Sequence, residues 1–171
     1  MDPTATAPGR PDKAEAFRLL RASIEADLSL IVSTHKTTTA GAVHAESRAE
    51  NDKDTRALES TYLARGLAQR ASELSEARAK LAVFSPRRFA ADAAAALGAL
   101  VKVENEDTEE ARWYLLAPAG GGLRLDVDGV DVAIVTPGSP IGDALIGKRA
   151  EDDFELRTRS GLHSYRVVEI R

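Results

Sequence analysis

The sequence predicts an α+β protein in which an antiparallel helical hairpin, a coiled coil, precedes a small antiparallel sheet with one short helix packed on it. Three observations predict this class. In the first half of the chain, apolar residues recur every three or four positions, which is the period of a single buried helix face. After residue 98 the pattern changes to short runs that alternate apolar and polar residues, as half-buried strands do. Pro86 separates the two patterns, because proline removes a backbone donor and disfavours helix in the residue before it.

The two helices of the hairpin are expected between residues 12 and 84. Each carries one narrow apolar stripe, and a short polar connection between them lets each helix cover the other. The segment THKTTTAGAV, residues 34–43, is a weak helix former because of its threonines and glycine, but we expect it to remain helical. The expected seam consists of Phe17, Leu20, Ile24, Leu28 and Ile31 on the first helix and Leu63, Leu67, Leu74, Leu81 and Phe84 on the second, with Arg70 and Ala77 at intervening positions.

The remaining parts of the chain follow from composition. Residues 1–11 are expected to be a disordered lead-in, and residues 85–98 a linker that contains a short alanine-rich helix. Residues 99–171 are expected to form the sheet domain. Its predicted strands lie in the runs ALVKVEN, ARWYLLAP, VDVAIVTP, DFELRTR and HSYRVVEI.

One short helix is specified by its own residues, in SPIGDALIGK at positions 139–148. Ser139 is a good N-cap, and Pro140 suits the first helical position. Gly147 can adopt the left-handed conformation after the helix ends. The apolar residues Ile141, Ala144 and Leu145 are expected to face the sheet.

Composition narrows the functional classes. The 171 residues include no cysteine and carry a formal net charge of -4. Without cysteine there are no disulfides, no thiolate catalysis and no zinc sites of the cysteine type, which fits a cytoplasmic protein. An acidic chain lacks the basic face of a protein that binds nucleic acid by itself, so a protein partner is expected. No run approaches the about eighteen apolar residues of a spanning helix, so no membrane partner is expected.

The segments TPGSPIGDALIGKRAEDDFELRT and SYRVVEI resemble the C-terminal domain of the bacterial GreA/GreB transcript cleavage factors. The serine-proline pair, the short helix, the glycine-lysine exit, an acidic turn and a closing strand occur in the family's order over about residues 131–171. The hairpin resembles the same family in layout, and AESRAENDKDTRALESTYLARG is similar to its tip in a looser way. The segment YLLAPAGGGLRLDVDG is similar to a GreA/GreB-like subgroup rather than to GreA itself.

The resemblance implies an accessory factor that docks on bacterial RNA polymerase and is not an enzyme by itself. Its C-terminal domain would have an FKBP-like fold, and its hairpin would enter the secondary channel of the polymerase. The factor would be a monomer that meets DNA and RNA only within the transcription complex. The residues implied in docking are Ser139, Pro140, Ile141, Leu145, Gly147 and Lys148.

Carboxylates gather between the two helices, in AENDKDTRALEST at positions 49–61. By the resemblance, Asp52 and Asp54 are the candidate catalytic and metal-binding residues, with Glu50 as a lesser candidate. They would hold a Mg²⁺ ion jointly with the polymerase, because magnesium prefers oxygen ligands and often takes only one or two carboxylates from one source. The alternative is a solvated loop in which the aspartates cap the second helix.

The tip departs from the family pattern, in which a glutamate follows the aspartate three residues later. Depending on the alignment, the place of that second acid falls on Ala57 after Asp54, or on Thr55 after Asp52. Channel entry is therefore better supported than cleavage, and a channel regulator without cleavage activity is the first alternative. A second departure is Asp143, at a place the family often fills with a basic residue.

Two other functional classes stay open. An FKBP-like prolyl isomerase would need an aromatic-walled pocket, for which Trp113, Tyr114, Phe154 and Tyr165 are few. A self-associating coiled-coil scaffold is disfavoured by Arg70 in the seam.

Overall fold

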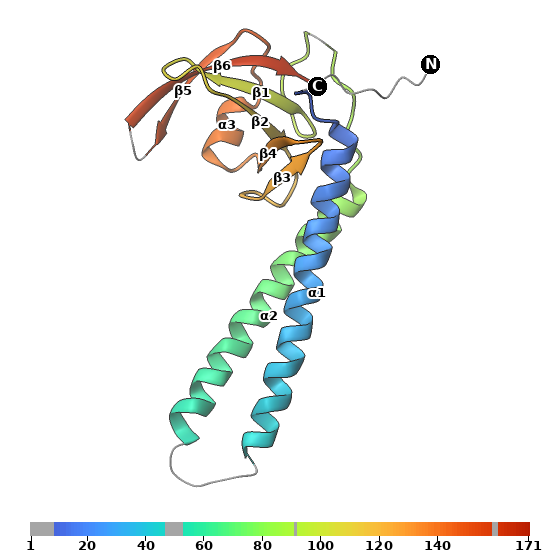
Figure 1. Ribbon diagram of the computed structural model, residues 1–171, viewed down its shortest axis with the longest axis vertical. Coiled ribbons are helices and arrows are strands. Elements are labelled where there is room, and N and C mark those ends of the chain that lie inside the picture. The colour runs from blue at the N-terminus through green and yellow to red at the C-terminus, as the bar shows by residue number, and fades with distance from the viewer. Residues whose placement is uncertain (1–8, 47–52, 91, 159–160) are drawn as a thin grey trace. The chain divides into compact units, whose positions relative to one another are not determined.

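The computed structural model describes residues 9–46, 53–90, 92–158 and 161–171, and within the helices it leaves out the side chains of residues 38–46, 53–58 and 60. The chain divides into two compact units (Figure 1). One unit contains the residues up to Arg21 together with Lys80–Arg171, and the other contains Ala22–Ala79. None of the helices in the described part of the chain is both long enough and apolar enough to cross a membrane.

The second unit consists of the parts of two long helices, α1 (Lys13–Glu46) and α2 (Lys53–Val83), that lie between Ala22 and Ala79. Figure 1 shows their chains running side by side in opposite directions, as predicted for a hairpin. The apolar stripe is buried at Ile24, Leu28 and Leu74, which are 2%, 7% and 3% exposed. An ion pair of 3.4 Å between Arg78 and Glu25 joins the two helices beside this stripe.

Helix α1 continues through the threonine-rich segment. The hydroxyl of Thr34 donates to the carbonyl of Leu30 at 2.9 Å, and that of Thr37 donates to the carbonyl of Thr34 at 2.8 Å. Threonine hydroxyls that donate to carbonyls of the preceding turn find their hydrogen-bond partners within the helix, so they are compatible with helical backbone. The expectation of helix in this weak segment is confirmed for its backbone.

The predicted seam does not extend along the whole of α2. Leu63 is 54% exposed, so its assignment to a buried seam is wrong. Figure 1 shows α1 and α2 spreading apart toward Glu46 and Lys53. A helix face that stands away from its partner remains in water, and its apolar residues stay uncovered.

The first unit contains a six-stranded sheet with the strand order β3-β4-β2-β1-β6-β5. Strand β2 pairs with β4 in parallel, so the sheet is mixed and the expectation of an antiparallel sheet is wrong at this pair. Parallel neighbours need a crossover, and β3 supplies it by pairing with the outer edge of β4. The strands are β1 (Leu100–Asn105), β2 (Ala111–Leu116), β3 (Arg124–Val127), β4 (Val130–Val135), β5 (Asp153–Thr158) and β6 (Gly161–Ile170).

Strand β1 lies between β2 and β6 in the middle of the sheet. Its pairing with β6 is antiparallel and shifts register between Lys102 and Val103. Just beyond the end of β6, the backbone groups of Leu100 and Arg171 exchange two hydrogen bonds of 2.9 Å. The residue that follows β6 therefore continues the pairing of β6 with β1 by one further pair of hydrogen bonds.

The alanine-rich segment before β1 is not a helix in the residues that are described, contrary to expectation. Its backbone groups bond to segments that are distant in sequence. The Ala95 amide donates to the Lys148 carbonyl at 2.7 Å, and the Ala95 carbonyl accepts from Gly147 at 2.8 Å. The Gly98 amide donates to Leu116 at 2.8 Å. These tertiary hydrogen bonds replace the intrahelical ones, so helix propensity is overridden.

Apolar layers are buried on both faces of the central strands of the sheet. On one face, the helix α3 (Pro140–Leu145) places Leu145 against a core that includes Val103, Leu116 and Val167. On the other face lies an apolar layer that includes Leu115 and is paired across β1, β2 and β4. This second layer consists of Leu100, Trp113, Leu115, Val132 and Ile134, all at most 4% exposed.

Candidate functional site

The segment that begins at Ser139 forms a tight corner between β4 and α3. The Ser139 hydroxyl donates to the Thr136 carbonyl at 2.7 Å and accepts from the Gly142 amide at 3.2 Å. Ser139 is therefore the N-cap of α3, with Pro140 in the first turn, as predicted. One hydroxyl satisfies a carbonyl before the helix and an amide inside it, which fixes the direction in which α3 leaves the sheet.

Gly142 makes this corner possible, and the sequence analysis did not single it out. A Cβ at Gly142 would lie 2.0 Å from the Thr136 carbonyl oxygen, so a larger residue would force the backbone apart. The available signal was spacing, because a glycine three residues after the capping serine allows helix and strand to approach closely. The serine-proline-any-glycine order thus has a structural cause.

The exit from α3 is held by backbone and side-chain contacts. Gly147 has a φ of +83°, which confirms the left-handed conformation expected there. The Lys148 ammonium group donates to the Asp153 carbonyl at 2.9 Å. Leu145 is fully buried, and Ile141 packs against the same core. Leu145 and Ile141 therefore hold the segment against the core of the sheet, and its outer surface is formed by other residues.

The outer surface of this segment consists of other side chains. Pro140 and Asp143 are exposed, and so is Gly147. Ile146 is 43% exposed, although it is a large apolar residue. The sequence analysis did not name Ile146, and alternation with the buried Leu145 was the signal that could have found it. The solvent-facing part of the α3 segment is therefore partly apolar and carries one acid.

The acidic tip falls mostly outside the described residues. Asp52 and Glu50 lie outside them, and nothing is described of the Asp54 side chain. The backbone of Asp54 lies in the first turn of α2, which begins at Lys53. Among the described side chains, no group of three or more His, Asp or Glu residues could hold a metal ion.

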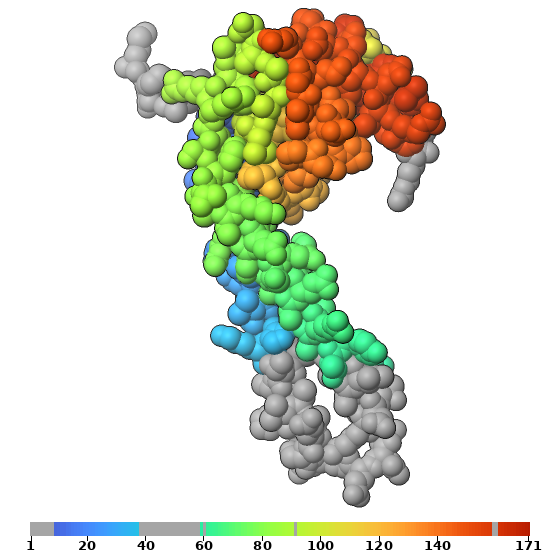
Figure 2. Space-filling view, turned by 180° about the vertical axis from the view of Figure 1, so that it is seen from behind, coloured from blue at the N-terminus to red at the C-terminus, as the bar shows by residue number. Residues whose placement is uncertain are grey.

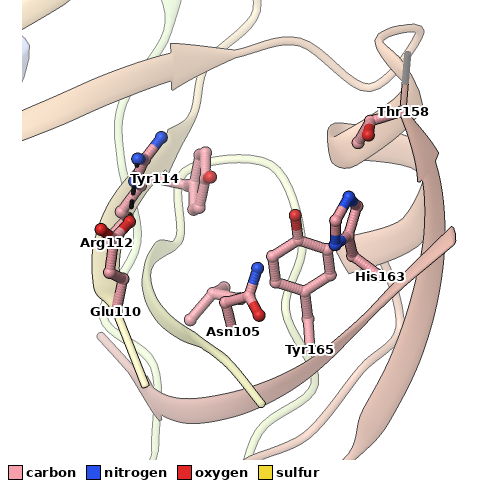
Figure 3. A pocket seen from close by; sticks show the side chains of 8 residues that line it. Asn105, Glu110, Arg112, Tyr114, Thr158, His163 and Tyr165 are labelled. Carbon is pink, nitrogen blue, oxygen red and sulfur yellow. Dashed lines mark hydrogen bonds and ion pairs between the residues drawn. The ribbon is translucent and has the colours of Figure 1, made fainter. Parts of the chain in front are cut away.

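A pocket of about 240 Å³ opens on the face of the sheet that also carries α3 (Figure 3). Val103 lines it between two tyrosines, Tyr114 from β2 and Tyr165 from β6. Tyr165 also stacks on Phe154, with ring centroids 5.4 Å apart. The other lining residues are polar, namely Asn105, Glu110, Arg112, Thr158 and His163.

The pocket has a defined electrostatic character. Arg112 and Glu110 form an ion pair of 3.2 Å at its rim. Burial raises the pKa of the Tyr114 hydroxyl above its ordinary value of 10.0, with a smaller opposing effect from Arg112. The hydroxyl is therefore protonated at neutral pH. The sequence analysis named both tyrosines as aromatics but missed Asn105 and Arg112, which alternate with buried residues on neighbouring strands.

A local basic cluster lies near the start of α1, despite the acidic net charge. Lys13 and Arg87 each lie 4.8 Å from the ring centroid of Phe89. Burial lowers the pKa of Lys13, and the neighbouring charges of Arg171, Arg87 and Arg88 lower it further. Figure 2 shows the segment after α2, in yellow-green, on the surface beside the C-terminal residues, in red. The sequence analysis missed this cluster because it considered only the net charge of the whole chain, which is -4.

The fold and the α3 corner define a class of protein, a helical hairpin chain with a small mixed-sheet C-terminal domain. Residues 90–171 match the family model described as "Transcription elongation factor, GreA/GreB, C-term". This match covers the C-terminal half of the chain, which is therefore similar to the C-terminal domain of the GreA/GreB transcription elongation factors.

Curated relatives carry the same family name. GreA of Bartonella henselae is 33% identical over 102 residues, which is 60% of this chain and 60% of the relative. GreA of Rhizobium leguminosarum bv. trifolii is 33% identical over 101 residues, 59% of this chain and 60% of the relative. The chain thus spans about 60% of the length of the curated relatives it matches.

Solved structures show a more distant likeness. The GreA factor homolog 1 (Gfh1) protein of Thermus thermophilus is 20% identical, with a TM-score of 0.38, over 88% of this chain and 94% of that chain. The GreA/GreB factor from Nitrosomonas europaea is 22% identical, with a TM-score of 0.36, over 57% of this chain and 78% of that chain.

Proposed function

We propose that this protein is a cytoplasmic accessory factor that binds bacterial RNA polymerase during transcript elongation. The observation that carries the proposal is the match of residues 90–171 to the GreA/GreB C-terminal domain, which contains the corner of Ser139 and Gly142. The curated relatives that are named elongation factors support it. The factor would act as a monomer and would meet nucleic acid only within the transcription complex.

The α3 segment is the proposed docking surface. Its internal contacts hold Ser139, Gly147 and Lys148 in place, while Pro140 and Ile146 face solvent. An exposed apolar side chain on a rigid corner is the kind of residue that anchors a protein interface. Ile141 and Leu145 would contribute by supporting that corner from the core.

Polymerase binding by Ile146→Glu tests this surface. Placing a charge there would weaken binding to core polymerase at least about tenfold, because a charge buried in an interface without a partner is costly. Leu162→Glu is the matched control, since Leu162 is 52% exposed and lies on β6 outside the α3 segment. Failure of the wild-type protein to bind polymerase at low salt would refute the proposal.

The hairpin tip is proposed to enter the secondary channel and to supply Asp52 and Asp54, with Glu50, to a Mg²⁺ ion shared with the polymerase. The ion would supply an activated water for hydrolysis of backtracked RNA, while the tip would contribute carboxylate oxygens. The chain would stimulate the polymerase's own nuclease activity without being an enzyme by itself.

A cleavage assay on backtracked complexes separates stimulation from channel occupancy. Asp52→Ala and Asp54→Ala would each reduce RNA shortening, whereas Glu59→Ala, an exposed residue further along α2, would not. Inhibited cleavage by the wild-type protein would identify a channel regulator instead. Prolyl isomerisation is not favoured, because the pocket on the sheet has five polar side chains around its two tyrosines.

A further inference from the structure

We propose that the pocket between Tyr114 and Tyr165 is a binding site for a carboxylate carried on a short aliphatic chain. The proposal rests on the direction of the hydrogen-bond donors that line the pocket. It is independent of polymerase binding, since it uses none of the α3 surface.

The orientation of the Asn105 amide is fixed by the chain itself. Its Oδ1 atom accepts from the backbone amides of Asp107 at 2.8 Å and Thr108 at 3.2 Å. With the oxygen occupied in this turn, the NH2 group is the side of the amide left for the pocket. Figure 3 shows the nitrogen of Asn105 directed into the space between the two tyrosines. Asn105 is thus a donor here.

The two tyrosine hydroxyls add further donors. Neither the Tyr114 nor the Tyr165 hydroxyl forms a hydrogen bond with the residues that the structure describes, and both rings line the pocket. A hydroxyl can donate or accept, but Asn105 beside them can only donate. A ligand atom that accepts from all three groups satisfies them together, whereas a donor ligand leaves the Asn105 amide unpaired.

Charge at the rim favours an anionic acceptor. Among the lining residues, Glu110 alone carries a carboxylate, and Arg112 holds it at 3.2 Å. Arg112 lines the pocket, and among the described residues only its Nη2 group is paired, with Glu110, so its Nε and Nη1 groups are available to a second carboxylate. Hydrogen bonds in which one partner is charged are about twice as strong as neutral ones.

The volume of the pocket and the apolar residue at its base indicate what the ligand carries besides its carboxylate. Val103 is buried below the pocket and offers an apolar surface. A cavity of about 240 Å³ is below the usual range of drug-sized sites, so it fits a few methylene groups with one polar end. The aspartyl or glutamyl side chain of a protein and a small free carboxylic acid share this chemistry.

Two probes test the site in the full-length chain, a glutamate blocked at both ends by acetyl and methylamide groups, and free glutarate. Binding is followed by the side-chain NH2 signals of Asn105 in ¹⁵N-labelled protein. The correspondingly blocked glutamine is the neutral control and would bind at least about tenfold more weakly, since it lacks the charge. Tighter binding of the blocked glutamate would identify a protein side chain as ligand, and tighter binding of glutarate a small acid.

Conservative variants assign the contacts. Tyr114→Phe and Tyr165→Phe remove one hydroxyl each and would each weaken binding about tenfold. Arg112→Gln would weaken it as well, whereas Glu110→Gln would strengthen it by releasing Arg112. Arg18→Gln is the matched control, because Arg18 pairs with Glu15 within α1 and is not among the residues that line the pocket.

The proposal is overturned if neither probe shifts the Asn105 signals, or if the blocked glutamine binds as well as the blocked glutamate. It is also overturned if both tyrosine variants bind like the wild type while their folded spectra are unchanged. These outcomes leave polymerase binding untouched, so the two proposals fail separately.

Discussion

Leu20 of α1 lies against Gly120 in the loop between β2 and β3, so closely that a Cβ on Gly120 would come within 2.7 Å of the Leu20 Cδ1 atom. Gly120 also has a φ of +84°, where other residues are strained. The loop itself is hydrogen-bonded to β4, through Gly122 and Ile134 at 2.9 Å. The glycine-rich turn is therefore a contact site for the first helix and not only a change of chain direction.

Gly120→Ala is expected to lower the free energy of unfolding by about 2 to 4 kcal/mol, from backbone strain and from overpacking against Leu20. Urea denaturation measures the loss. Gly122→Ala is the control, because its φ is +90° but nothing lies within 4 Å of its Cβ position. Only the strain would be lost there, about 1 to 2 kcal/mol. Equal losses in the two variants would contradict the contact with Leu20.

Gly142→Ala is expected to disrupt the α3 corner, since its Cβ would collide with the Thr136 carbonyl oxygen. The loss should exceed about 3 kcal/mol, because backbone atoms must move, and polymerase binding should fall with it. Gly138→Ala serves as control, with nothing within 4 Å of its Cβ and no positive φ. Thermal unfolding and polymerase pull-down of both variants check this. Normal stability of Gly142→Ala would mean that the corner relaxes easily.

The raised pKa of Tyr114 predicts a loss of stability in alkali. Above the ordinary pKa of 10.0, the unfolded chain releases the Tyr114 proton while the folded chain keeps it. The unfolded state then binds fewer protons, so the free energy of unfolding falls as pH rises from about 10 to the folded pKa. Tyr114→Phe should remove this part of the pH dependence. Urea denaturation at about pH 9 and about pH 11 compares the two proteins.

Replacing a leucine of α2 by alanine should destabilise the helical hairpin to a different degree at different positions along the helix. Leu74→Ala is expected to cost about 2 to 4 kcal/mol, because Leu74 is 3% exposed. Leu63→Ala should cost less than about 1 kcal/mol, since Leu63 is 54% exposed and leaves no cavity. Circular dichroism during urea denaturation measures both. A large loss at Leu63 would show that this end of the hairpin is closed in solution.

Local rules made the α3 segment predictable. Ser139, Pro140 and Gly147 act within a few residues of their own positions, so cap, first turn and exit could be read in order. Helix α1 was predictable for the same reason, since Ile24 and Leu28 follow one stripe. Their burial confirms the stripe in the first half of α1.

Long-range partners made other parts unpredictable. Ala95 bonds to Gly147 and Lys148, which no local pattern announces, so the alanine-rich segment was wrongly expected to be a helix. The parallel pair of β2 and β4 depends on β3 filling the connection between them. The pocket, likewise, needs Asn105 and Tyr165 to meet across β1 and β6. The tip residues Asp52 and Glu50 lie outside the described part of the chain and stay predictions.

The double hydrogen bond between Leu100 and Arg171 has a consequence for synthesis of the protein. A ribosome releases β1 and β2 well before β6, so β1 emerges with one edge unpaired and must wait for its neighbour. Unpaired strand edges attract other chains, and the interval before β6 emerges is when the nascent domain is most prone to aggregation. The sheet can close only after its last strand has left the ribosome, whereas the hairpin, which is made earlier, can form while translation continues.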